Sequence, residues 1–139
     1  MSNLNLNISL LMETFIKKFF KAMDNAVKEL DLPITHQDTM LIMVTFRSPG
    51  LTIGELVESV CRDKSQITRK IKELESKNLL IRKSSETDAR VSKMYLTDEA
   101  KIIAEKLDVT RSQVLNKMLV GLDKEEASSL AMILGKLSV

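Results

Sequence analysis

Two helix starts follow each other closely near the middle of the chain and leave room for only a short helix between them. Thr52 is followed three residues later by Glu55, and Asp63 is followed at the same spacing by Gln66. A capping side chain with Glu or Gln three residues later is typical of a helix N-terminus. The spacing therefore predicts a helix over about 53–60, a turn at "CRDK" and a second helix from residue 64, which is the order of a helix-turn-helix.

The second of these helices has an uneven distribution of charge. At about 100° per residue, the segment 63–80, "DKSQITRKIKELESKNLL", has one narrow apolar stripe, formed by Ile67, Ile71 and Leu74. The opposite face gathers only hydrogen-bonding and cationic side chains, namely Ser65, Thr68, Arg69, Lys72 and Ser76. A face without carboxylates suits an anionic partner, although a few unpaired cations on a solvated helix give the same pattern.

The positive charge of the chain is concentrated in this region. The whole sequence of 139 residues has a net charge of only +2, but between Arg62 and Lys93 ten Lys and Arg residues stand against five Asp and Glu residues. This is the pattern expected of a binding element on a nearly neutral scaffold. With 44% hydrophobic residues, the chain is long enough to form one globular domain with its own core.

The residues after this helix predict a β-hairpin. Asn78 can adopt the left-handed conformation that ends a helix. "LLIRKS" and "VSKMYL" are short segments compatible with strands, and the polar "SETDAR" between them carries no core residues. We expect a hairpin with a loop longer than a tight turn. A helix-turn-helix followed directly by a basic two-stranded wing is a winged helix.

The segments before the helix-turn-helix are predicted to be helical. Apolar residues recur at helical spacing from Ile8 to Leu30, which predicts a long amphipathic helix. Pro33 is expected to end it. Thr35 is then the predicted N-cap of a helix that reaches about Phe46.

Two more helices are predicted after the hairpin. Thr97 is expected to cap a long helix that Gly121 stops, and Asp123 with Glu126 is expected to start a last helix that ends near Leu137. The predicted fold class is therefore mainly α with a small β-hairpin wing, a winged helix-turn-helix between long N- and C-terminal helices, in a single domain over residues 1–139.

The sequence gives indirect signals about compartment. The single cysteine, Cys61, excludes an internal disulfide and fits a reducing environment. The polar start "MSNLNLN" does not have the pattern of a signal peptide, and no window is apolar enough to span a membrane. We expect a soluble, cytoplasmic protein.

The segment 51–101, "LTIGELVESVCRDKSQITRKIKELESKNLLIRKSSETDARVSKMYLTDEAK", resembles the MarR family of bacterial winged-helix transcriptional regulators. The resemblance rests on "LTIGEL" at the short helix, "DKSQITRKIKELESKNLL" at the recognition helix, and "DAR" in the wing followed by "LT". It implies a symmetric homodimer in which residues 1–34 and 98–139 form the dimerisation helices and residues 35–97 form the DNA-binding lobe. The alternative is that the terminal helices pack on each other within a monomer.

The resemblance also implies a function. We expect a sequence-specific regulator of transcription, most simply a homodimeric repressor of palindromic operators that a small-molecule effector relieves. Repression is the commoner mode in the family, and no residue here distinguishes it from activation. Operator sequence, regulated genes and effector lie beyond the sequence.

The second helix of a helix-turn-helix lies in the major groove with its N-terminal residues at the base edges. That geometry assigns base contacts to Ser65, Gln66, Thr68 and Arg69, and phosphate contacts to Lys64 and Lys72. Gln66 can pair with adenine and Arg69 with guanine, because both matches are bidentate. Gln66 is alternatively the partner of the Asp63 cap, and Ser65 alternatively supports only the first turn.

The wing supplies the other predicted DNA contacts. Arg90 looks like the family arginine that enters the minor groove, where A·T-rich stretches concentrate negative potential. Asp88 is expected to fix the loop by accepting hydrogen bonds or an ion pair, since a carboxylate facing phosphate would be repelled. Backbone contacts are assigned to Arg82, Lys83 and Lys93.

Two kinds of signal to the regulator are considered. In the family, small aromatic or phenolic effectors bind a helix-lined cleft between the dimer region and the DNA-binding lobe, and His36, Met40 and Arg47 are the residues assigned to it here. Cys61 lies close to Arg62 and Lys64, which could lower the pKa of a thiol and make it a redox switch. A lone cysteine in a turn is more often a packing residue.

The sequence offers little for catalysis or cofactors. One His and one Cys far apart form no metal-ligand cluster, and there is neither a phosphate-binding glycine loop nor a nucleophile with its base. We expect no enzyme activity, no cofactor and no metal. The alternatives to the favoured function are a winged-helix protein-interaction module without specific DNA binding and a cysteine-based redox-sensing regulator.

Overall fold

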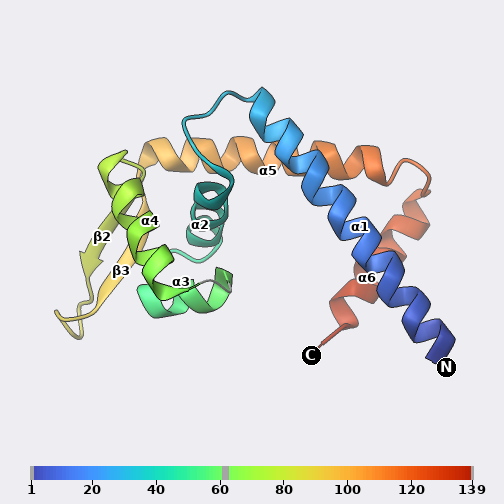
Figure 1. Cartoon of the computed structure of the whole chain (residues 1–139), viewed down its shortest axis with the longest axis horizontal. Coiled ribbons are helices and arrows are strands. Elements are labelled where there is room, and N and C mark those ends of the chain that lie inside the picture. The colour runs from blue at the N-terminus through green and yellow to red at the C-terminus, as the bar shows by residue number, and fades with distance from the viewer. Residues whose placement is uncertain (1, 61–62, 139) are drawn as a thin grey trace. The chain divides into compact units, whose positions relative to one another are not determined.

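The computed structural model describes residues 2–60 and 63–138 (Figure 1). The elements, in chain order, are α1 (Ser2–Glu29), α2 (His36–Arg47), β1 (Leu51–Thr52), α3 (Ile53–Val60), α4 (Lys64–Ser76), β2 (Leu80–Ser84), β3 (Ser92–Leu96), α5 (Asp98–Met118) and α6 (Lys124–Lys136). The predicted fold class, mainly α with a small β wing in a winged helix, is confirmed. The chain forms two compact units, one made by the chain up to Leu30 and from Val109 onward, the other by Asp31–Asp108.

Most helix starts are at the predicted caps. The Thr35 hydroxyl accepts from the N–H of Asp38 at 3.2 Å, and the Asp38 carboxylate accepts from the N–H of Thr35 at 2.9 Å. Thr52 and Glu55 make the same reciprocal pair at the start of α3. The Thr97 hydroxyl accepts from the N–H of Ala100 at 3.1 Å and starts α5. These bonds satisfy N–H groups that a helix leaves without an internal partner, which is why such local signals locate helix starts well.

The cap of α4 differs from the prediction. The Asp63 carboxylate accepts from the N–H of Ser65 at 3.2 Å and from its hydroxyl at 2.7 Å, so the partner of the cap is Ser65 and not Gln66. These two hydrogen bonds, the one from the hydroxyl first, also lower the pKa of Asp63. Ser65 is thereby held in the first turn of the helix.

The predicted start of the first helix is wrong, and Pro33 does not set its end. The helix α1 begins at Ser2, six residues before Ile8, and ends at Glu29. Asp31 has a φ of 50°, and this left-handed residue turns the chain before Pro33 is reached. Pro33 therefore lies in the connection to α2 and does not end the helix.

The wing is a three-stranded antiparallel sheet in the order β1-β3-β2, where the sequence predicted two strands. The additional strand is β1, whose Leu51 and Thr52 pair with Met94 and Lys93. β2 pairs with β3 over its whole length, from Leu80 opposite Leu96 to Ser84 opposite Ser92. Asn78, at φ 58°, makes the left-handed turn that was predicted.

The core of the unit 31–108 fixes the orientation of α4. Its buried apolar side chains come from α2, α3, α4, both long strands and the first half of α5, and include Leu41, Ile42, Leu56, Ile67, Ile71, Leu74, Met94 and Leu107. The apolar stripe of α4 is thus buried as predicted, which turns the opposite face of the helix to solvent.

The other unit leaves most of its apolar residues exposed. In α1, Phe19 is buried and stacks on Phe15 at 6.4 Å between ring centroids, and the Arg111 guanidinium lies 5.0 Å from the Phe19 ring. Large apolar side chains that remain exposed in α1 and α6 include Leu4, Leu6, Ile8, Leu11, Ile16, Phe20, Met132, Ile133 and Leu134. A single chain does not cover these faces.

Among the residues described, no helix is both long enough and apolar enough to cross a lipid bilayer.

Candidate nucleic-acid interface

The outward face of α4 carries three exposed cations. Lys64, Arg69 and Lys72 are exposed, and within residues 2–60 and 63–138 none of the three has an ion-pair partner. Together with Asp63, Ser65 and Thr68 they line a shallow hollow. Thr68 is half-buried, and its hydroxyl donates to the Lys64 carbonyl at 2.8 Å. This face therefore presents positive charge and no carboxylate apart from the capping Asp63.

Gln66 lies to one side of this hollow. Its side chain is exposed but lines a small gap between α2 and α4, together with Gln37, Met40 and Lys70. The structure thus brings five of the six predicted α4 residues together in one hollow and sets Gln66 at its edge toward α2.

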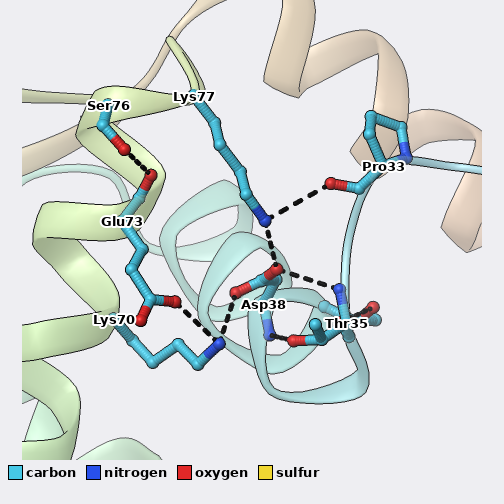
Figure 2. Close-up of polar contacts among 8 residues, drawn as sticks. Pro33, Thr35, Asp38, Lys70, Glu73, Ser76 and Lys77 are labelled. Carbon is cyan, nitrogen blue, oxygen red and sulfur yellow. Dashed lines mark hydrogen bonds and ion pairs between the residues drawn. The ribbon is translucent and has the colours of Figure 1, made fainter.

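The two remaining lysines near this helix point away from the hollow. Lys70 lies 3.4 Å and Lys77 lies 3.2 Å from the carboxylate of Asp38, which is fully buried in α2 (Figure 2). This cluster was not predictable from the sequence. The capping spacing of Thr35 and Asp38 was visible in the sequence, but the two lysines are far from them along the chain.

Cations lie on both faces of the wing sheet, and their contacts differ between the two faces. Side chains alternate between faces along a strand, so Arg82 and Lys83 point to opposite sides. The Arg82 guanidinium pairs with Glu75 of α4 at 2.8 Å. Lys83 stands opposite Lys93 on β3, and its ammonium lies 5.1 Å from the centre of the Tyr95 ring. Arg82 is thus bound within the lobe, while Lys83 and Lys93 share the other face.

The wing loop is organised around Asp88. Its Oδ1 accepts from the backbone N–H of Arg90 at 3.0 Å and from the Arg90 Nε at 3.3 Å. The backbone of the loop is closed by bonds from Ser85 to Val91 and from Val91 to Asp88. The Arg90 side chain is 91% exposed, so its guanidinium stands at the wing tip in solvent.

The three residues assigned to an effector cleft are not gathered in one pocket within the described parts of the chain. His36 and Arg47 are the first and last residues of α2, about 16 Å apart along the helix. Arg47 pairs with Asp108 of α5 at 2.7 Å. Met40 lines the gap beside Gln66, whose volume of about 20 Å³ is too small for an aromatic ring.

A larger cavity lies elsewhere in the same lobe. Its volume is about 620 Å³, and it is bounded by the end of α2, the wing strands and the start of α5. Its lining combines apolar and aromatic groups with charges of both signs and includes Phe46, Pro49, Ile81, Lys83, Tyr95, Asp98, Glu99 and Lys101. This cavity was not predictable from the sequence, because its walls come from segments that are distant in the chain.

Two further sequence-based hypotheses concern reactive groups. Cys61, assigned as a possible redox switch, lies outside the described residues. In the part of the chain that the structure describes, no three His, Cys, Asp or Glu side chains gather in a way that could hold a metal ion.

Solved structures share this architecture. A MarR family protein from Bacillus stearothermophilus superposes with a TM-score of 0.87 at 19% identity, over 98% of this chain and 94% of that one. FabT from Streptococcus pneumoniae, solved in complex with DNA, superposes with a TM-score of 0.74 at 19% identity, over 94% and 92% of the two chains. At this identity the likeness establishes the fold, which is the winged helix.

Sequence comparisons go further than the fold. The family model described as "MarR family" matches residues 34–92. The HTH-type transcriptional regulator SarZ of Staphylococcus aureus is 30% identical over 114 residues, which cover 82% of this chain and 74% of SarZ. With the winged lobe and its cationic helix, these matches define a DNA-binding transcriptional regulator. The chain belongs to the MarR family.

Proposed function

We propose that the protein is a homodimeric repressor that binds a palindromic operator with α4 and the wing loop of each protomer. The observation that carries the proposal is the exposed face of α4, where Lys64, Arg69 and Lys72 have no ion-pair partner among the described residues. Unneutralised cations on the second helix of a helix-turn-helix match the phosphates and base edges of a major groove. FabT, which has the same fold, was crystallised with DNA.

The side chains on this face of α4 differ in length and in the DNA groups that they can contact. Arg69 has a planar group that fits guanine, and Gln66 can pair with adenine. Thr68 and Ser65 are short, and their hydroxyls already donate to Lys64 and Asp63, so each can only accept from a base. Lys64 and Lys72 are the phosphate contacts.

In the wing, the geometry favours some contacts over others. Arg90, which is exposed and whose Nε donates to Asp88, is proposed to contact the DNA minor groove. Lys83 and Lys93 lie on the same face of the wing sheet and are proposed to contact the phosphate backbone of the DNA. Arg82 is the weakest of the assigned contacts, since Glu75 already neutralises it.

The dimer is proposed from the exposed apolar faces of α1 and α6. Monomeric proteins rarely expose a large contiguous apolar surface, and α6 has no buried residue at all within its 13 residues. The occupant we propose is a second copy of this chain, because a two-fold dimer would also give the two-fold arrangement of lobes that a palindrome needs.

We also propose that the cavity of about 620 Å³ is the effector site, in place of the residues assigned from the sequence. Its volume suits a small molecule. Phe46 and Tyr95 supply aromatic surfaces, and charged groups of both signs lie beside them, so a small aromatic molecule with a polar group fits the lining. The chain has one tyrosine, so the ring signals of Tyr95 in an NMR titration with benzoate report directly on this cavity. Shifts that disappear in Phe46→Ala would support the assignment, and no shift at millimolar benzoate would refute it for this probe.

We propose no catalytic activity and a cytoplasmic location, in keeping with a regulator of transcription.

The experiment that tests the function is a binding titration. The protein is titrated into its own upstream DNA and into a scrambled fragment of equal length, each at several salt concentrations. Preference for the upstream fragment, with an affinity that falls steeply as salt rises, supports an operator-binding regulator. Equal and weak binding to both would move the operator elsewhere or favour a protein-interaction module.

A further inference from the structure

One buried carboxylate joins the start of α2 to the recognition helix α4. Asp38 is the third residue of α2 and is 0% exposed. Its Oδ2 accepts from the Thr35 N–H at 2.9 Å and from the Lys77 ammonium at 3.2 Å. The Lys70 ammonium lies 3.4 Å from the other oxygen, Oδ1, for which the described part of the chain supplies no hydrogen bond of good geometry. A single side chain thus caps α2 and contacts two cations of the α4 region (Figure 2).

The two lysines lie on the same side of the helix. They are seven residues apart, which is about two turns, so both face Asp38. Lys70 also pairs with Glu73 at 2.9 Å, and Lys77 also donates to the Pro33 carbonyl at 3.5 Å (Figure 2). Contacts therefore hold α4 at its middle and at its C-terminal end, and both lead to the first turn of α2.

The carboxylate stays ionised in this position. Burial alone would raise the pKa of Asp38, but the hydrogen bonds from Thr35 and Lys77 and the charges of Lys70 and Lys77 outweigh it and lower the pKa. A buried anion is costly unless cations remain beside it. Any rotation of α4 that withdraws Lys70 or Lys77 is therefore opposed.

Rotation of α4 is what decides which cations face DNA. Neighbouring residues of a helix differ by about 100°, so in the run Arg69-Lys70-Ile71-Lys72 a rotation of about that size would exchange one basic residue for another on the DNA side. The apolar stripe that opposes rotation consists of only Ile67, Ile71 and Leu74. The contacts of Asp38 select Lys70 as the inward cation and leave Arg69 and Lys72 outward.

We propose that Asp38 is a positioning residue for DNA recognition: it fixes the rotation of α4 on α2 and keeps Lys70 and Lys77 away from DNA. The proposal rests on the proposed function, because its effect is on discrimination between DNA sequences. It adds a residue outside the DNA-facing surface to those that determine specificity.

The test compares two variants that both change the contacts at the start of α2. Asp38→Asn removes the charge but keeps an oxygen that can accept from the Thr35 N–H. Thr35→Ala, the matched control, removes the hydroxyl that accepts from the Asp38 N–H at 3.2 Å and leaves the carboxylate with both lysines. Both weaken the start of α2, and only the first releases the lysines.

The first readout is the ratio of affinities for the upstream fragment and for scrambled DNA. For Asp38→Asn we expect the ratio to fall at least about fivefold, with binding to scrambled DNA unchanged or tighter and the salt dependence steeper by about one to two units as the lysines reach phosphates. For Thr35→Ala the ratio should stay at the wild-type value. Equal losses on both DNAs for Asp38→Asn, which a lower folded fraction would produce, would overturn the proposal.

The second readout needs no DNA. Acetylation rates of single lysines are measured by mass spectrometry, with the exposed Lys72 as internal reference. In Asp38→Asn, Lys70 and Lys77 should approach the rate of Lys72; rates unchanged from wild type would overturn the proposal even if the wild type showed no preferred DNA and the proposed function failed. Should Asp38→Asn not fold, Lys77→Met replaces it. The carboxylate then keeps Lys70 as its cation, so a Lys70 that is acetylated more slowly relative to Lys72 is the supporting result and an unchanged Lys70 is the contrary one.

Discussion

At the residue scale, the basic side chains around α4 differ in whether they already contact a carboxylate within the protein. Lys70, Lys77 and Arg82 contact Asp38 or Glu75. Arg69 and Lys72 have no such partner among the described residues. A cation with a carboxylate at about 3 Å gains less from a phosphate, because the new contact replaces an existing one. The free residues are therefore the ones whose removal should be felt in DNA binding.

Arg69 and Lys72 are expected to contribute to DNA binding in different ways. Arg69→Ala should reduce the discrimination between operator and scrambled DNA by about 1–3 kcal/mol, because a bidentate contact to a base is lost. Lys72→Ala should weaken binding to all sequences alike and reduce the salt slope by about one unit. The two variants are compared by fluorescence anisotropy on both DNAs at several salt concentrations. Indistinguishable effects on the two DNAs would contradict this division.

The carboxylate of Asp38 should also affect acid stability. Its pKa is lowered in the folded protein, so its contribution is fully present above the pKa of an unfolded aspartate, about 4, and is lost as pH falls through the folded value. Asp38→Asn should lower the free energy of unfolding at pH 7 by about 2 kcal/mol. Urea unfolding at pH 7 and at decreasing pH below 4 should show the difference between wild type and variant shrinking. A difference that does not change with pH would mean that packing, and not charge, is responsible.

At the element scale, the sequence predicts what local chemistry controls. The starts of α2 and α3 follow from Thr35 and Thr52, whose capping bonds span three residues. Strand β1 was missed because it has two residues and forms only by pairing with the distant β3. The start of α1 was missed because the polar residues before Ile8 break the apolar pattern.

In the candidate site, too, the features that local sequence controls were predictable, and the contacts between distant segments were not. The outward face of α4 was predictable, because one apolar stripe fixes one face of a helix. The partners of Lys70, Lys77 and Arg82 were not, since Asp38 and Glu75 meet them only in the folded lobe. The cavity beside Tyr95 could not be predicted for the same reason.

The wing loop tests whether Asp88 positions Arg90. Asp88→Ala should weaken operator binding by about 1 kcal/mol, because the Arg90 guanidinium and backbone lose their acceptor. The matched control is Glu86→Ala, which removes the same charge from the same exposed loop. If charge alone mattered, both variants would bind DNA more tightly, since each removes a repulsion. Opposite effects of the two substitutions, measured by gel shift on one operator fragment, are the expected result.

At the scale of the whole molecule, the distribution of apolar surface argues for self-association. The unit 31–108 buries its apolar residues in its own core, whereas α1 and α6 leave theirs exposed, including Leu11 at 61% and Ile133 at 53%. Each lobe carries one α4 and one wing, which suffice for half of a palindromic site. Stability of the terminal helices and affinity for a full site should therefore depend on the same contact between copies.

A charge placed on the apolar face of α6 should separate the copies. Ile133→Lys costs the isolated chain little, because the side chain is already half-exposed, but a lysine buried between two copies would be desolvated without a partner. Ser128→Lys is the control, because it adds the same charge to the polar side of the same helix. Sedimentation should give twice the chain mass for the wild type and for Ser128→Lys, and a single chain mass for Ile133→Lys at micromolar concentration. On DNA, Ile133→Lys should lose most of its affinity for the full palindrome while its affinity for an isolated half-site is kept, because α4 and the wing are untouched. A wild type that sediments as a monomer would leave the apolar faces without the partner proposed for them and would require each lobe to bind DNA alone.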